Sequence, residues 1–359
     1  MRRLLATTAA AAMLALAATA PIAGAAYEPL GTATTTVSLS PAFASFLKAN
    51  GLRIEAAAPA RAKGRRLSLP LAAGKWDPTI GRGEIESEGA IVFKGKRRSL
   101  PFKNLTVKAN RTPLTAKVGG GQLKVASAKS VAAKREGFGE SFSAKALRLS
   151  TKVATRLNKK LRPERPFQPN QLIGALRTKS VPETMAVLPR NRLALAFAPQ
   201  LVAKLNDLFV SLNPISPAEL APGPVLSFPI AAASTISPDG AEGTLRTAGE
   251  AELLQLGAGQ LFWGEQWLDL SAGVDLIDAN LQPSPPFGGK QAQGPLFALS
   301  LQGAQIAPNP RARTVAVAGA SLTLSQLAAD QMNQLLAGGK PVFVAGEALG
   351  TVSFTAQGQ

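Results

Sequence analysis

Histidine and cysteine are both absent from this 359-residue chain, and tyrosine occurs only once, as Tyr27. Without imidazole or thiol groups the chain cannot build Ser-His-Asp or Cys-His catalytic arrangements, and it lacks the usual ligands of zinc. It cannot form disulfides either, so burial of apolar side chains alone must stabilise its domains. These absences predict a protein that binds other molecules without transforming them, with no catalytic residue and no metal site.

Long hydrophobic runs are also missing after the first 25 residues. Arg2 and Arg3 precede an apolar stretch at residues 4–20, and small residues follow at 23–25, which is the pattern of a signal peptide cleaved before Ala26. No later stretch approaches the ~20 apolar residues of a membrane-spanning helix. We therefore expect a secreted protein, free or associated with the cell wall, whose mature chain has no transmembrane anchor. A retained N-terminal anchor helix is the alternative.

Acidic residues are scarce in the first half of the chain. Residues 31–190 hold 31 Lys and Arg against 9 Asp and Glu, a balance of +22, whereas residues 191–359 hold 7 against 12, a balance of −5. A basic surface outside the cell can bind anionic envelope polymers, lipid headgroups or acidic proteins. It can also face the acidic half of the same chain or simply remain solvated. Nucleic acid is not an expected partner, because the protein is exported and few aromatic residues lie among the charges.

One sequence pattern occurs twice. Residues 67–73 (LSLPLAA) match residues 226–232 (LSFPIAA), and after similar spacings residues 83–89 (GEIESEG) match residues 243–249 (GTLRTAG). A strand followed by a short helix with an early proline is predicted before each copy, at 36–51 and 192–206. A second strand-helix unit closes each half, at 147–158 and 322–333, and a final strand follows. The pattern indicates an internal duplication.

Between the predicted helices, apolar residues alternate with polar ones over short segments separated by turns. Leu100, Phe102, Leu105 and Val107 are examples. This period of two predicts a mainly β fold made of two tandem, antiparallel, sandwich-like domains, with an open barrel as the alternative form. Short amphipathic helices are expected near the start and end of each domain. The expected boundaries are a signal peptide at 1–25, a basic domain at 31–176, a linker at 177–190 and a slightly acidic domain at 191–359.

The central block of each half resembles the HtaA domain, a module of bacterial cell-surface and secreted haem-uptake proteins. The resemblance rests on residues 69–74 (LPLAAG), 83–85 (GEI) and 91–95 (IVFKG), and on the preceding helix at 42–47. It covers about a hundred residues of each half and is weaker in the second. It implies a β-rich fold with short helices and a ligand site near the opening helix, around Phe43 and Phe46.

The residues that would bind haem do not follow the family pattern. The resemblance implies a Tyr in the opening helix as the axial ligand of the iron and a supporting His after the central strand. This chain has Phe46 and Lys96 at those positions, and neither side chain can take over the role. Tyr27, Met185 and Met332 are the remaining soft or phenolate candidates. We expect no tightly ligated cofactor, while haem, another hydrophobic molecule or an anionic ligand remain open as ligands.

Two basic clusters are the strongest candidates for binding an anion. Arg61, Lys63, Arg65 and Arg66 precede the first strand pair of the central block, and Lys96, Arg97 and Arg98 occupy the next predicted hairpin. If the two segments pack together, seven cations meet. Each contributes ~1 kcal/mol near an anionic surface, which is enough for reversible binding to an anionic wall polymer. The tentative ligand-binding residues are therefore Phe43, Phe46, Arg65, Arg66, Lys96, Arg97 and Arg98.

Trp263 and Trp267 are the other residues that could contact a ligand. They are spaced four residues apart and form either part of the core or a platform on which a sugar or haem stacks. Packing in the core is the favoured interpretation. The function expected from all these features is a secreted, non-catalytic, HtaA-like binding protein of the cell envelope. A structural or adhesive protein held by charge to anionic wall polymers is the alternative.

Overall fold

The fold is mainly β, with 59% of the described residues in strands and 14% in four helices, as the alternating pattern predicted. The computed structural model describes residues 27–359 except 78–81, 109–112, 119–120, 129–130, 257–258, 271–274 and 284–291. The expected signal peptide lies outside the described residues. Within the described part of the chain, no helix has both the length and the apolar character needed to cross a membrane.

The first half forms one antiparallel sheet and carries two helices. Its elements are β1 (Glu28–Leu39), α1 (Pro41–Ala49), β2 (Arg53–Ala57), β3 (Arg61–Lys63), β4 (Arg66–Asp77), β5 (Arg82–Lys94), β6 (Ser99–Lys108), β7 (Pro113–Val118), β8 (Gly121–Ser127), β9 (Val131–Glu136), β10 (Gly139–Leu149), α2 (Thr151–Leu161) and β11 (Leu172–Pro182). Eight strands close on themselves in the order β4-β5-β6-β7-β8-β10-β11-β1, because β1 also pairs with β4. The remaining strands β2, β3 and β9 pair with β5, β4 and β10 respectively.

The second half has a similar strand order in a separate antiparallel sheet. Its elements are β12 (Met185–Ala186), β13 (Arg192–Phe197), α3 (Pro199–Asp207), β14 (Val210–Ile215), β15 (Glu219–Ala221), β16 (Val225–Pro229), β17 (Thr235–Ile236), β18 (Gly243–Arg246), β19 (Glu250–Gln255), β20 (Gly259–Asp269), β21 (Asp275–Pro283), β22 (Ala292–Ser300), β23 (Gln305–Asn309), β24 (Thr314–Leu324), α4 (Gln326–Leu336) and β25 (Ala348–Gln357). Residues expected in the linker instead complete β11 or form β12, which pairs with β17 of the second sheet.

Local sequence explains where the helices begin. Ser40, Ser150 and Ser325 each accept a hydrogen bond from a backbone N–H of the first turn of α1, α2 and α4. Proline occupies the first position of α1 and α3, where a missing N–H costs no hydrogen bond. The helices then bury one apolar stripe against the sheet, as Val153 and Leu157 do from α2.

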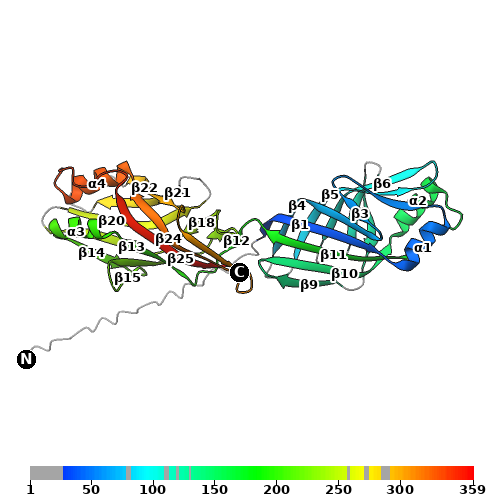
Figure 1. Ribbon diagram of the computed structural model, residues 1–359, viewed down its shortest axis with the longest axis horizontal. Coiled ribbons are helices and arrows are strands. Elements are labelled where there is room, and N and C mark those ends of the chain that lie inside the picture. Colours follow the sequence, from blue (N-terminus) through cyan, green and yellow to red (C-terminus); the bar gives the residue numbers. More distant parts are fainter. Residues whose placement is uncertain are drawn as a thin grey trace, which may run out of the picture.

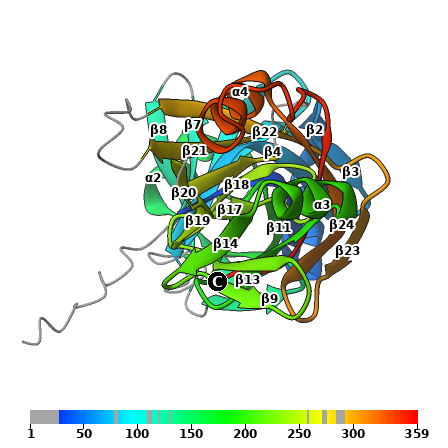
Figure 2. The same ribbon diagram turned by 90° about the vertical axis from the view of Figure 1, so that its left-hand side faces the viewer.

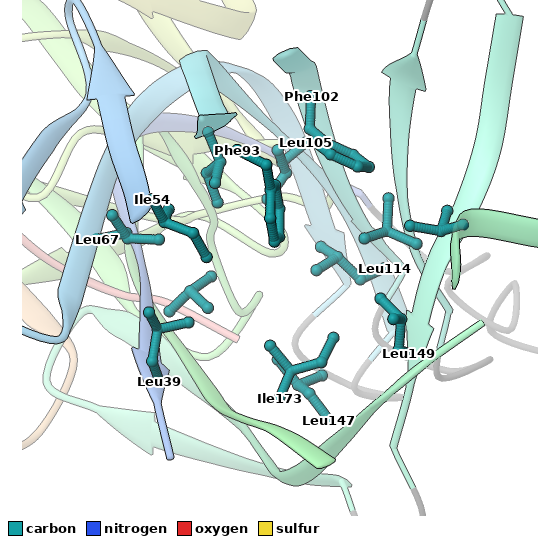
Figure 3. Close-up of a pocket in the computed structure, with 14 residues that line it drawn as sticks. Leu39, Ile54, Leu67, Phe93, Phe102, Leu105, Leu114, Leu147, Leu149 and Ile173 are labelled. Atoms are coloured by element: carbon teal, nitrogen blue, oxygen red, sulfur yellow. The ribbon is translucent and has the colours of Figure 1, made fainter. Parts of the chain in front are cut away.

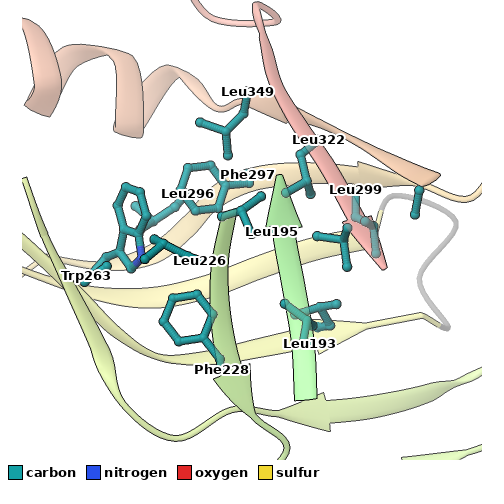
Figure 4. Close-up of a cluster of buried hydrophobic side chains, with 14 of the residues drawn as sticks. Leu193, Leu195, Leu226, Phe228, Trp263, Leu296, Phe297, Leu299, Leu322 and Leu349 are labelled. Atoms are coloured by element: carbon teal, nitrogen blue, oxygen red, sulfur yellow. The ribbon is translucent and has the colours of Figure 1, made fainter. Parts of the chain in front are cut away.

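Each half has its own hydrophobic core. In the first half, apolar side chains from many strands converge inside the closed sheet (Figure 3). In the second half, Trp263 is buried among Phe197 and Phe297, with ring centroids 6.0 and 5.6 Å away (Figure 4). Burial of this many apolar side chains provides the stability that disulfides provide in many exported domains.

The same structural devices recur in both halves. Gly89 and Gly249 have φ angles of 89° and 92°, and a Cβ atom on either would lie under 3.0 Å from the backbone N of Ala60 or Ala218. The two halves lie end to end along the long axis, so that α1 and α2 occupy one outer end of the molecule and α3 and α4 the other (Figures 1 and 2). The duplicated pattern in the sequence thus corresponds to duplicated geometry.

A cation-lined groove as the candidate functional site

The closed sheet of the first half encloses a small apolar cavity. Its volume is about 40 Å³, and its lining is entirely aliphatic and aromatic, including Leu39, Phe93 and Ile173 (Figure 3). Sites for small molecules usually measure about 300–1,000 Å³. The cavity can therefore hold a very small apolar molecule, but neither haem nor a ligand of similar size.

Phenylalanine side chains fill the region between α1 and the sheet, where the family resemblance places a ligand. Phe43 is 1% exposed and Phe167 is 1% exposed, and the half-buried Phe46 packs against both, with ring centroids 6.2 and 5.1 Å away. Phe93 and Phe102 extend the cluster toward the strands. Phe43 is thus a core residue, and Phe46 lies at the edge of this core rather than in an open pocket.

An open groove of about 420 Å³ lies at the outer end of the first half, where three chain segments meet. They are the end of α1 with the residues that follow it, the turn between β5 and β6, and the end of α2 with the loop after it. The lining residues are Asn50, Gly51, Leu52, Gly95, Lys96, Arg97, Arg98, Leu161, Arg162, Pro163 and Glu164. Four cations and one carboxylate thus face a volume in the usual range of a ligand site.

Backbone and amide hydrogen bonds hold the walls of the groove in place. The N–H of Gly95 donates to the carbonyl of Arg98 at 2.8 Å and closes the β5–β6 turn. Asn50 joins the other two walls, since its Nδ2 donates to Phe46 O at 2.9 Å and its Oδ1 accepts from the N–H of Arg165 at 2.7 Å. The groove is therefore built by the fold and does not depend on a flexible tail.

The cations in the groove lack acidic partners. Lys96, Arg97, Arg98 and Arg162 are exposed and form no ion pair with any residue in the described ranges. In contrast, the neighbouring Lys94 and Arg53 both pair with Glu55. The hydrogen bond from Lys94, and to a smaller extent the one from Arg53, holds the pKa of this carboxyl below its usual range. Four cations without such an ion pair in the described ranges line the groove, where an anion can approach several of them at once.

The second basic cluster does not contribute to the groove. Arg65 and Arg66 lie at the turn between β3 and β4, where Arg66 pairs with Lys63 across the hairpin and the carbonyl of Arg65 accepts the N–H of Leu39. Neither residue lines the groove, so the seven cations do not share one site. The groove instead includes Arg162, which was not among the predicted ligand-binding residues. In the sequence, Arg162 is a cation directly before Pro163 at the end of an amphipathic segment, which could have indicated it. In the structure, Arg162 ends α2 with a φ of 51°.

The soft and phenolate candidates lie away from this groove. Tyr27 precedes β1, at the end of the first half that faces the second, and the ammonium of Lys75 lies 5.0 Å from the centre of its ring. Met185 and Met332 are buried in the core of the second half. Among the groove-lining residues there is no imidazole, phenol or sulfur, so the groove does not fit an iron-ligated haem. Within the described ranges, no cluster of three or more His, Cys, Asp or Glu could hold a metal ion.

The two tryptophans of β20 have different environments. Trp263 is a core residue with 2% exposure, whereas Trp267 is 44% exposed and the guanidinium of Arg246 lies 4.0 Å from the centre of its ring. A register shift between Gly264 and Trp267 separates them, so they do not form one platform. Trp263 is packed in the core, as expected, whereas Trp267 lies on the surface and stacks with the guanidinium of Arg246.

No family model matches the chain, and no curated protein matches it. Solved structures similar to it include the C-terminal domain of HtaA from Corynebacterium glutamicum, at 13% identity over 48% of this chain and 98% of that domain, with a TM-score of 0.37. The N-terminal domain of the same protein matches at 14% identity over 47% and 97%, with a TM-score of 0.36. The haem-binding protein HtaB from that organism matches at 8% identity over 49% and 95%, with a TM-score of 0.35.

Proposed function

We propose that this protein is a non-catalytic binding protein of the cell envelope and that it holds an anionic ligand in the groove at the outer end of its first half. The observation that carries this proposal is the convergence on one open groove of Lys96, Arg97, Arg98 and Arg162, none of which forms an ion pair with another described residue. A chain without imidazole and thiol has few means of catalysis, which agrees with a binding role.

The ligand class follows from the side chains in the groove. Guanidinium groups bind carboxylates and phosphates through paired hydrogen bonds, and an ammonium adds a mobile point charge. Envelope polymers that carry repeated phosphate or carboxylate groups present this chemistry. Haem is a narrower candidate, suggested by the resemblance to HtaA domains. Its two carboxylates could bind the cations, but the groove has no side chain to ligate its iron.

Binding to purified cell wall tests the proposal. The triple variant Lys96→Glu/Arg97→Glu/Arg98→Glu is expected to raise the Kd for cell wall, measured by co-sedimentation at physiological salt, by at least about 100-fold. The reason is that each cation contributes ~1 kcal/mol. Raising the salt concentration should weaken binding of the unmodified protein, because the charges are exposed and screened. Binding that does not respond to salt would contradict the proposal.

A matched control separates the groove from the general positive charge of the first half. Lys103→Glu/Lys117→Glu/Lys145→Glu changes the net charge equally, at exposed positions on the sheet. We expect less than a 10-fold loss for this control. The excess of +22 in residues 31–190 favours the second candidate, a structural or adhesive envelope protein held by diffuse charge. Equal losses in the two triple variants would support that candidate and reject the groove.

Haemin titration tests the narrower candidate. With no iron ligand in the groove, added haemin is expected to leave the Soret band without the shift of a ligated iron. If a shift appears, the Tyr27→Phe variant tests the one phenol of the chain. Any such shift contradicts the expectation that the protein does not ligate iron, and a shift that persists in this variant also removes Tyr27 as the ligand.

A further inference from the structure

A hairpin of the first half reaches into the core of the second half. The turn at Gly137 and Phe138 joins β9 to β10, and Phe138, 8% exposed, belongs to the hydrophobic core of the second half. A Cβ atom on Gly137 would lie 3.2 Å from Cβ of Pro310, which precedes β24. The hairpin end faces the second half along the long axis of the molecule (Figure 1). The two halves are therefore joined by packing as well as by the chain.

Charged side chains are buried around this contact. Arg313 of the second half, 7% exposed, donates from Nη1 to the carbonyl of Phe138 at 3.1 Å. Its Nη2 lies 3.6 Å from Oε2 of Glu28, and its Nη1 lies 3.9 Å from Oε1 of Glu140. One guanidinium from the second half thus faces two buried carboxyl groups from the first half.

The surroundings of Glu28 include contributions from every element packed against it. Its Oε1 accepts a hydrogen bond from the N–H of Ala186 in β12 at 3.3 Å. Arg313 faces it from the second half, while Arg135 of β9 and Glu140 of β10 lie nearby and pair with each other at 3.4 Å. Two carboxylates that are both ionised and withdrawn from water are costly, and the second half contributes to this burial by placing Arg313 and Ala186 against Glu28.

We infer that the contact between the hairpin and the second half is proton-dependent, so that the two halves dock most tightly when Glu28 carries a proton and separate more readily when it is ionised. This inference goes beyond the proposed ligand binding and does not depend on it. The groove lies at the opposite end of the first half, so the two functions can be tested independently.

The direction of the pH dependence follows from the burial of the carboxyl groups. Burial is the largest effect on Glu28 and raises its pKa from 4.5 to about 7, against the opposing effect of Arg313. Burial likewise raises the pKa of Glu140. Because the docked form binds the proton more tightly, docking is strongest below about pH 4.5, weakens as the pH rises toward 7, and changes little above that.

Native-state hydrogen exchange of the full chain measures the docking equilibrium at this contact. The amide of Ala186 is a direct reporter, because it donates to Glu28. After correction for the intrinsic exchange rate, its protection is expected to fall between pH 5 and pH 8 by up to about 70-fold, the limit set by a pKa that returns from about 7 to 4.5 when the halves separate. The amide of Leu149, which donates to Gln171 O at the other end of the first half, should change little.

The isosteric variant Glu28→Gln mimics the protonated carboxyl and is the decisive comparison. It is expected to keep the protection of Ala186 nearly constant, within about 3-fold, over the same range of pH. Should Glu28→Gln fail to fold, Glu140→Gln provides the second variant and should reduce the pH dependence in part. Constant protection in the unmodified chain, or an equal fall in chain and variant, would overturn the inference. Anion binding to the groove should be the same in all of these proteins.

Discussion

The two outer ends of the molecule have similar backbone conformations but expose different kinds of side chain. At the end of the first opening helix, Gly51 has φ 63°, and at the corresponding place after α3, Phe209 has φ 53°. In the first half Arg53 pairs with Lys94, and in the second Ser211 pairs with Leu254, so Lys96 and Leu256 occupy corresponding positions in the next turn. One end therefore presents cations, whereas the other presents apolar side chains that are 84% and 83% exposed.

This difference separates residues that maintain the fold from residues that are free to change. The Nδ2 of Asn158 donates to the carbonyl of Phe167 at 2.9 Å, and its Oδ1 accepts from the N–H of Phe167 at 2.7 Å. Asn333 forms the same two hydrogen bonds with Phe343, at 2.8 Å each. These internal contacts are the same in both halves. The exposed turns beside them carry no such constraint, so the two ends could acquire different surfaces.

The largest expected effect tests whether the shared backbone is equally demanding in both halves. A Cβ atom on Gly174 would collide with the carbonyl of Ser38, and one on Gly350 with the carbonyl of Ala196. Gly174→Ala and Gly350→Ala should each lower the free energy of unfolding of their own half by at least about 3 kcal/mol, because backbone atoms must move. Calorimetry of the full chain measures the loss, and Gly121→Ala, with open space around it, is the control.

A smaller effect is expected from the paired asparagines. Asn158→Ala and Asn333→Ala leave buried backbone groups without partners and should each cost about 2 kcal/mol. Asn333→Ala should cost more, because Asn333 also accepts a hydrogen bond from Val342, at 2.8 Å. Denaturant unfolding of both variants checks this order. If only one of the two variants lowers the free energy of unfolding by less than about 0.5 kcal/mol, the corresponding asparagine contacts do not stabilise the two halves equally.

The smallest effect concerns the two residues that differ at the helix ends. Phe209→Gly should stabilise the second half by about 1 kcal/mol, because glycine adopts a positive φ without strain, and Gly51→Phe should destabilise the first half by a similar amount. Gly51→Phe also places a ring at the edge of the groove and should weaken anion binding. If Phe209→Gly is neutral or destabilising, the exposed ring has packing that its 84% exposure does not indicate.

Much of the fold followed from local patterns. Alternating apolar residues predicted the strands, and amphipathic segments, two of them with an early proline, predicted the helices close to where they occur. These predictions succeed because period and capping depend on neighbours in the chain. The candidate site followed only in part. The sequence predicted the groove residues Lys96, Arg97 and Arg98. It also predicted Arg65 and Arg66, which lie at a different hairpin, because strand register decides which loops meet.

Composition and repetition alone thus establish a mainly β chain in two similar halves, without the side chains of common catalytic sites. Long-range packing decided the rest. The groove joins segments at residues 50–52, 95–98 and 161–164, and the contact at Arg313 joins residues of the two halves. Neither can be derived from local periodicity, because each depends on how closed sheets bring distant turns together and on which charges that packing removes from water.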